Sequence, residues 1–205
     1  MSWLDQARRL TDLDLLERLE LTEDECTRQA ERLVGDDPEA VLAVHPDWAP
    51  PSVLAPLLER GGKDGFVVED MTDLDEFTPI AGVELPPGPL YAVRHVDRGD
   101  AMSNWSPDEA LPAIAAAGRS PLTLTEGICW LLQQPDRLEP NKCFMTIGSR
   151  KPTARGLDAR TPAIWISGGT GRDGVARRGA PKVGWCWAGN RHTWLGFAST
   201  GGRGG

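Results

Sequence analysis

Apolar residues recur at helical spacing in the first part of the chain. Residues 2–21 carry leucines three and four positions apart, which predicts an amphipathic helix. Thr22 and Glu25 form a capping box, in which each side chain bonds the backbone amide of the other residue, so a second helix is predicted to begin here. Gly35 follows as a C-terminal stop. We therefore predict a helical N-terminal segment over residues 1–38.

Strands and helices alternate in the middle of the chain. The short β-branched stretch at residues 41–44 and the alternating stretch at residues 90–96 predict two strands. A short helix is predicted over residues 51–60, between a proline and a pair of glycines. Two more capping boxes predict helices that begin after Ser106 and after Thr123.

From residue 141 onward, the pattern changes to strands separated by glycine and proline turns. The predicted strands cover residues 143–147, 163–167, 183–188 and 192–198. Helices first and strands last indicate an α+β fold with a mostly antiparallel sheet and with helices packed on one face. We assign the core domain to residues 39–200 and the glycine-rich residues 201–205 to a flexible tail.

Composition places the chain among globular proteins and shows a charge asymmetry. Apolar residues make up 40% of the chain and charged residues 25%, and no run of 18 apolar residues could span a membrane. The net charge is −8, but residues 141–205 hold eleven basic and two acidic side chains, which makes this third +9 and the first 140 residues −17. This asymmetry indicates either an anionic partner for the C-terminal third or two parts that neutralise each other within one fold.

The cysteines indicate reduced thiols and no metal site. The four cysteines are separated by 103, 14 and 43 residues, and none has the paired spacing of a zinc ligand set. The N-terminal residues contain no apolar export signal, so we predict a cytoplasmic protein whose cysteines stay reduced. We predict no metal and no cofactor.

Residues 185–194 carry the candidate chemistry. Strand alternation places two tryptophans on the face opposite Cys186, and a turn at Gly189–Asn190 is predicted to fold His192 back alongside. A histidine next to Cys186 would lower the pKa of the thiol and create a nucleophile. Cys186 and His192 are therefore the catalytic candidates, and the ligand-binding candidates are Arg150, Trp187, Asn190 and Trp194. The alternative is that the tryptophans pack in the core, Cys186 is buried and His192 is structural.

Two other motifs invite a nucleotide or nucleic-acid interpretation. Residues 169–174 spell GxGxxG directly after a predicted strand, but no helix pattern follows and no acidic residue occurs after Asp173. We reject a dinucleotide site and predict a loop between two strands. Tryptophans interleaved with basic residues after residue 141 are typical of a surface that binds nucleic acid, whereas apolar neighbours such as Ile164 and Ile166 favour core positions.

The closing segment of the chain resembles a known family. Residues 184–196, GWCWAGNRHTWLG, are similar to a motif of an actinobacterial family that is described only as a domain of unknown function. The stretches at residues 61–66, 96–99, 106–111 and 162–167 extend this resemblance over residues 40–200. The resemblance implies a bacterial cytoplasmic protein, and it implies no reaction, cofactor or catalytic residue.

The leading functional hypothesis is an accessory protein of the bacterial cytoplasm. It binds a partner protein or an anionic small molecule through its basic, tryptophan-rich C-terminal third. The first alternative is a small-molecule enzyme that uses Cys186 and His192. The second alternative is a nucleic-acid-binding protein.

Overall fold

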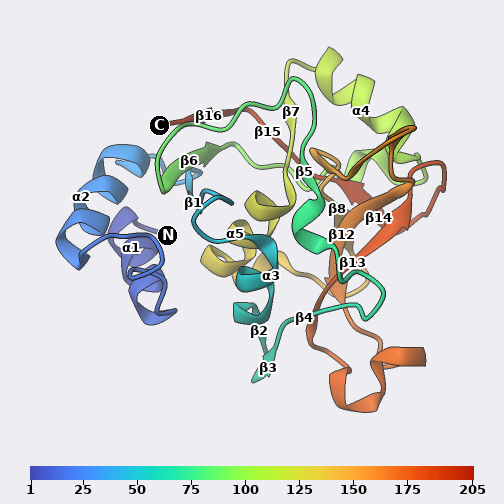
Figure 1. Cartoon of the computed structure of the whole chain (residues 1–205), viewed down its shortest axis with the longest axis horizontal. Helices are drawn as coiled ribbons and strands as arrows, with labels where there is room; N and C mark the ends of the chain where they lie inside the picture. Colours follow the sequence, from blue (N-terminus) through green and yellow to red (C-terminus); the bar gives the residue numbers. More distant parts are fainter.

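The computed structural model describes residues 1–205 and has an α+β fold. Its α-helices are α1 (Trp3–Asp12), α2 (Glu23–Val34), α3 (Pro51–Leu54), α4 (Pro107–Ala116) and α5 (Leu124–Gln133). The helices α1 and α2 lie together at one end of the molecule, α5 lies in the middle, and a sheet with α4 forms the other end (Figure 1). The α+β class and the mostly antiparallel pairing predicted from the sequence are confirmed.

Capping boxes start four of the five helices. The helices α1, α2, α4 and α5 follow Ser2, Thr22, Ser106 and Thr123, and each of these hydroxyls accepts a bond from the N3 amide while the N3 acid returns one. Each box satisfies amide groups that the first turn of a helix leaves without a partner. The three helix starts predicted from such boxes are confirmed.

The first helix is shorter than predicted. It ends at Asp12, and residues 13–21 form turns because Asp14 and Glu20 adopt left-handed backbone angles, with φ of 54° and 56°. Leu15 and Leu19 are nevertheless buried in the larger core cluster. The leucine spacing thus reported burial correctly and helix length incorrectly.

The expected tail at residues 201–205 contains a strand instead. Strand β16 (Gly202–Gly204) pairs antiparallel with β6 (Leu90–Arg94), which in turn pairs with β1 (Val41–Val44) in a three-stranded sheet. The C-terminal end of the chain therefore runs beside β6, on the side of the molecule that holds α1 and α2 (Figure 1). The physical reason is Arg203, whose side chain is 7% exposed and forms an ion pair with Glu126 of α5.

A five-stranded sheet forms the second half of the molecule. Its order is β14 (Leu195–Phe197), β8 (Cys143–Met145), β12 (Arg160–Ile166), β13 (Pro181–Trp187) and β4 (Phe66–Val67). Strand β12 is antiparallel to β8 and β13, whereas β14 runs parallel to β8 and β4 runs parallel to β13. The hairpin predicted between residues 183–188 and 192–198 is therefore wrong, since β8 and β12 lie between these strands. The segment from Ala188 to Trp194 crosses from one strand to the other.

The two faces of this sheet pack against different helices. Phe144, Ile164 and Val183 belong to the larger core cluster together with α5. Their neighbours Cys143, Met145 and Ala163 point the other way and pack with Ala110 and Ile114 of α4 in a second cluster. The helices therefore cover opposite faces, not one face as predicted.

Short pairs of strands and single turns of 3-10 helix complete the fold. The strand pairs are β2 (Glu59–Arg60) with β3 (Lys63–Asp64), β5 (Thr78–Pro79) with β9 (Ser149–Arg150), β7 (Ser120–Pro121) with β15 (Ser199–Thr200), and β10 (Pro152–Thr153) with β11 (Gly156–Leu157). The helix predicted over residues 51–60 ends early, as α3 followed by one 3-10 turn at Ala55–Leu57.

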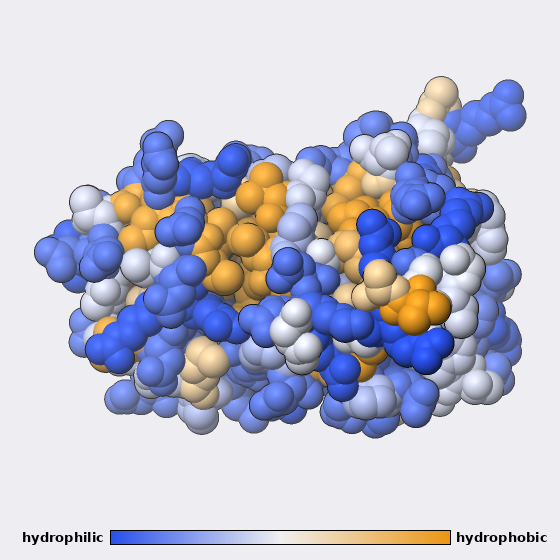
Figure 2. Space-filling view, turned by 90° about the horizontal axis from the view of Figure 1, so that it is seen from below, coloured by the Kyte–Doolittle hydropathy of each residue, from blue (hydrophilic) through white to orange (hydrophobic).

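The surface combines a polar rim with some exposed apolar side chains. Seen from below, apolar side chains gather in two areas that a polar strip divides (Figure 2). No helix reaches the length and apolarity that a membrane crossing requires.

Candidate functional site

One edge of the five-stranded sheet gathers aromatic and polar side chains. The strands β8 and β14 both begin at this edge, and the antiparallel strand β12 ends there. The edge thus unites Lys142 before β8, Trp194 before β14 and Trp165 near the end of β12. Sequence positions about 25 residues apart meet here because of strand direction alone.

Two cavities adjoin at this edge. The first has a volume of about 380 Å³ and is lined by Asn141, Lys142, Trp165, Ile166 and Trp194. The second, of about 220 Å³, shares Asn141, Lys142 and Trp194 and extends toward Asp100, Ser103 and Thr193. The first volume lies in the range of roughly 300–1,000 Å³ that is typical of small-molecule sites. We call the two cavities together the tryptophan cavity.

Two indole rings form a corner in the tryptophan cavity. The ring centres of Trp165 and Trp194 lie 6.5 Å apart and their planes differ by 72°. Trp165 covers the backbone of Gly184 on the neighbouring strand, where an added Cβ would approach the indole to 2.6 Å. Lys182 places its Nζ 4.8 Å from the centre of the Trp165 ring. Trp194 is 43% exposed, so one wall of the corner is open to a ligand.

Charged side chains beside the tryptophan cavity neutralise one another. The Nζ of Lys142 lies 2.9 Å from Asp100 and 3.9 Å from Glu139. Arg98 donates two bonds to the same Asp100 carboxylate and pairs with Glu139 at 2.9 Å. The Arg98 guanidinium accordingly holds the pKa of Asp100 and that of Glu139 below their usual values. Two cations and two anions leave this border without net charge.

The same neutralisation extends over the whole C-terminal third. Seven of its eleven basic residues form ion pairs, most of them with acids from the first 140 residues: Lys142, Lys151, Arg160, Arg172, Lys182, Arg191 and Arg203. Arg160 is the most strongly tied, because it bonds Asp73 at 2.6 Å and Asp158 at 2.8 Å. The charge asymmetry of the sequence is thus largely balanced within one fold.

The structure does not bring the predicted catalytic pair together. Cys186 lies on the α4 face of the sheet, partly buried, and makes no hydrogen bond with His192. The ring of His192 instead lies 5.7 Å from that of Trp194, and its carbonyl accepts a bond from the Asn104 amide at 2.9 Å. Burial raises the pKa of the Cys186 thiol to about 11, which disfavours the thiolate that nucleophilic catalysis requires.

Alkylation against pH tests this state of Cys186. Because its pKa is raised, the neutral thiol dominates near neutral pH, and the rate of modification by iodoacetamide is expected to keep rising from about pH 7 to about pH 10 without a plateau. Mass spectrometry of the intact protein measures the rate, and Cys186→Ser is the control because the other three cysteines are buried. A rate that levels off below about pH 7 would instead reveal an activated nucleophile.

The predicted ligand-binding residues are dispersed. Trp194 alone lines the tryptophan cavity. Trp187 lies on the opposite face of the sheet, 48% exposed, with its ring centre 4.5 Å from that of Trp185. Asn190 is exposed in the turn after β13, and Arg150 is buried in β9, where its Nη2 donates to the carbonyl of Asp158 at 2.7 Å.

The sequence interpretation missed Asn141, Lys142 and Trp165 as a group. Each precedes or ends a strand, and only the order of the strands shows that these ends coincide. The alternation of apolar residues correctly separated Trp185 from Cys186, since Trp185 packs with the larger core and Cys186 with the smaller one.

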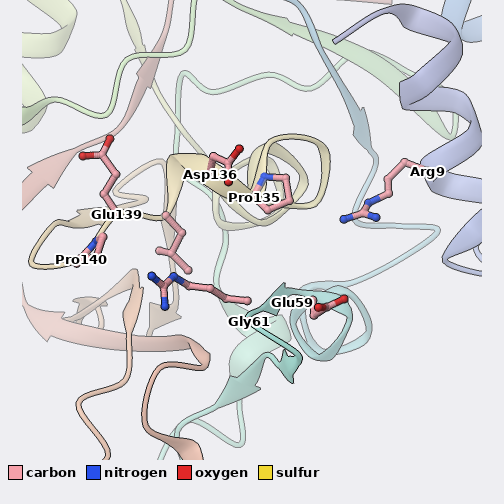
Figure 3. A pocket seen from close by; sticks show the side chains of 9 residues that line it. Arg9, Glu59, Gly61, Pro135, Asp136, Glu139 and Pro140 are labelled. Atoms are coloured by element: carbon pink, nitrogen blue, oxygen red, sulfur yellow. The ribbon is translucent and has the colours of Figure 1, made fainter.

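A second cavity lies between α1, the β2–β3 hairpin and the segment after α5. Its volume is about 360 Å³, and Figure 3 shows Arg9 and Glu59 at one end and Glu139 and Pro140 at the other. Leu138 is its only apolar side chain among the nine lining residues. Arg9 already donates to the carbonyl of Leu132 at 3.1 Å, and Glu139 is paired with Arg98. This cavity is therefore a polar surface hollow whose charged groups are largely engaged.

The donor sets for a metal ion are also absent. No group of three or more histidine, cysteine, aspartate or glutamate side chains is arranged to hold a metal ion. The four cysteines are free, and three of them are buried.

The fold and the cavity define an α+β protein with an aromatic cavity at one edge of its main sheet. The chain belongs to DUF5701, a family of unknown function, which matches residues 9–205. No curated protein and no solved structure matches the chain.

Proposed function

We propose that this protein is a cytoplasmic accessory protein that binds a small organic molecule in the tryptophan cavity and performs no chemistry of its own. One observation carries the proposal: Trp165 and Trp194 form an open aromatic corner over a cavity of about 380 Å³. Sites of this kind combine a mainly apolar wall with a few polar groups that fix the orientation of the ligand. Asn141 and Lys142 are the polar groups in this case.

The ion pairs favour this proposal over the other two hypotheses. A nucleic-acid surface needs several unpaired cations to neutralise phosphates, and most basic residues of the C-terminal third are engaged with carboxylates. An enzyme built on Cys186 needs a lowered thiol pKa, and burial raises it instead. A partner protein that inserts a side chain between the two indoles is the remaining alternative.

Native mass spectrometry of gently purified protein tests the proposal. We expect an extra bound mass of small-molecule size that Trp194→Ala loses and Trp187→Ala retains. The second variant is the matched control, since it removes a similarly exposed indole from the opposite face of the sheet. A bound mass that persists in Trp194→Ala and disappears in Trp187→Ala would place the site elsewhere, and a bound polypeptide would identify a protein partner.

A further inference from the structure

We infer that the tryptophan cavity binds an uncharged carbohydrate ring. This inference rests on the proposed function and names the chemical class of its ligand. Three features of the cavity lead to it: the angle between the indoles, the balance of charge at its border, and the uncommitted polar side chains beside the rings.

The angle between the indoles selects the shape of the ligand. Planes that differ by 72° cannot sandwich a flat aromatic molecule, because such a molecule can lie against only one of the two rings. A puckered ring fits a corner, since its C–H groups can meet one indole face while its edge meets the other. The face of an indole carries negative charge and attracts the weakly positive C–H groups of a sugar ring. Trp194, at 43% exposed, offers such a face.

The balance of charge at the border selects a neutral ligand. A carboxylate or phosphate would have to compete with Asp100 and Glu139 for Lys142, which lies 2.9 Å from the first and 3.9 Å from the second. The next cation, Lys182, is held by both oxygens of Asp173 at 2.8 Å. A cationic ligand meets the converse obstacle, because Arg98 and Lys142 already occupy the carboxylates and Lys182 lies over the Trp165 ring. A molecule that gains only hydrogen bonds breaks none of these pairs.

Uncommitted polar side chains supply those hydrogen bonds. Asn141, Ser103 and Thr193 line the two cavities, are exposed, and make no hydrogen bond to the protein through their side chains. An amide both donates and accepts, and so does a hydroxyl, which matches the dual character of sugar hydroxyl groups. Asn141 has a φ of 59°, a left-handed angle that asparagine tolerates better than most residues. This backbone holds the amide beside the two indoles.

Saturation-transfer NMR with a set of sugars tests the inference. The probes are glucose, galactose, mannose, N-acetylglucosamine, maltose and cellobiose, each at about 10 mM so that a Kd near 1 mM is detected. We expect at least one sugar to show transfer to its ring C–H protons, with binding that changes less than about twofold when the salt concentration is raised. Binding should weaken about tenfold or more in Trp194→Ala and in Asn141→Gly, and it should be unchanged in Trp187→Ala. The glycine variant keeps the left-handed backbone of position 141 while removing the amide.

The same measurement separates the failure of this inference from the failure of the proposed function. Inorganic phosphate, adenosine monophosphate and benzoate serve as charged and planar probes under identical conditions. If one of them binds in a Trp194-dependent manner and no sugar does, the carbohydrate inference is overturned while the binding function stands. If no probe binds and the native mass spectrum shows no bound molecule, both are overturned. Thermal unfolding of each variant confirms that a lost signal reflects the cavity and not the fold.

Discussion

Replacing Arg203 with alanine is expected to lower the free energy of unfolding by about 3–5 kcal/mol, the cost typical of breaking a buried ion pair. The Arg203 side chain is 7% exposed, and that of its partner Glu126 is fully buried. Arg203 also donates to the Ser120 hydroxyl at 2.6 Å and to the Pro121 carbonyl at 3.0 Å. Without the guanidinium, a carboxylate remains in the core with only the Tyr91 hydroxyl and the amide of Thr123 as donors. Chemical denaturation measures the loss.

A second variant identifies the stranded charge as the cause. Combining Arg203→Ala with Glu126→Gln removes the negative charge and keeps an oxygen that accepts from the Thr123 amide, so part of the lost stability should return. Arg178→Ala is the surface control, because Arg178 is exposed and forms no ion pair, and its effect should stay within about 0.5 kcal/mol. A loss below about 1 kcal/mol for Arg203→Ala would mean that the pair behaves like one at the surface.

Gln6→Ala should be nearly as damaging, with an expected loss of about 2–5 kcal/mol. The side chain of Gln6 is buried and completes the free edge of β1: its Nε2 donates to the Ala40 carbonyl at 3.0 Å and its Oε1 accepts from the Leu42 amide at 2.7 Å. The variant leaves both backbone groups unpaired where no water reaches them, which costs more than the loss of an exposed bond.

Hydrogen exchange gives this prediction a local readout. The Leu42 amide should lose protection in Gln6→Ala, whereas the amides of β6 that pair with β1 should change only as much as the global stability does. Arg8→Ala, an exposed position on the same helix, is the control for effects on α1 itself. Unchanged protection at Leu42 would show that the glutamine amide does not seal this edge.

Local patterns in the sequence predicted the local structure of this fold. The capping boxes at Thr22, Ser106 and Thr123 located helix starts, because the bonds of a capping box form within four residues. Alternation identified the faces of β13 for the same reason. The partner of β14 could not be predicted in this way, since its three residues pair with β8, more than 50 residues away, and no nearby turn sets that register.

The candidate site was only half predictable for a related reason. Trp194 stood out in the sequence because its segment is rich in tryptophan, but Asn141 and Trp165 join it only through the order of three strands. Arg203 shows the same limit at the end of the chain. In a run of glycines it indicated a loose tail, and only the position of Glu126 in the fold explains why that run is a strand.

The pairing of β16 with β6 also affects when the protein can finish folding during its synthesis. The three-stranded sheet joins residues 41–44 and 90–94 to residues 202–204, so one edge of this sheet is missing until residue 204 has left the ribosome. Until then, Glu126 lacks the arginine that balances its charge, and the surroundings of α5 cannot close around it without cost. Contacts that span so much of the chain also slow the final folding step. The growing chain therefore depends on its last few residues to complete its core, and premature termination a few codons early would yield a protein that cannot close it.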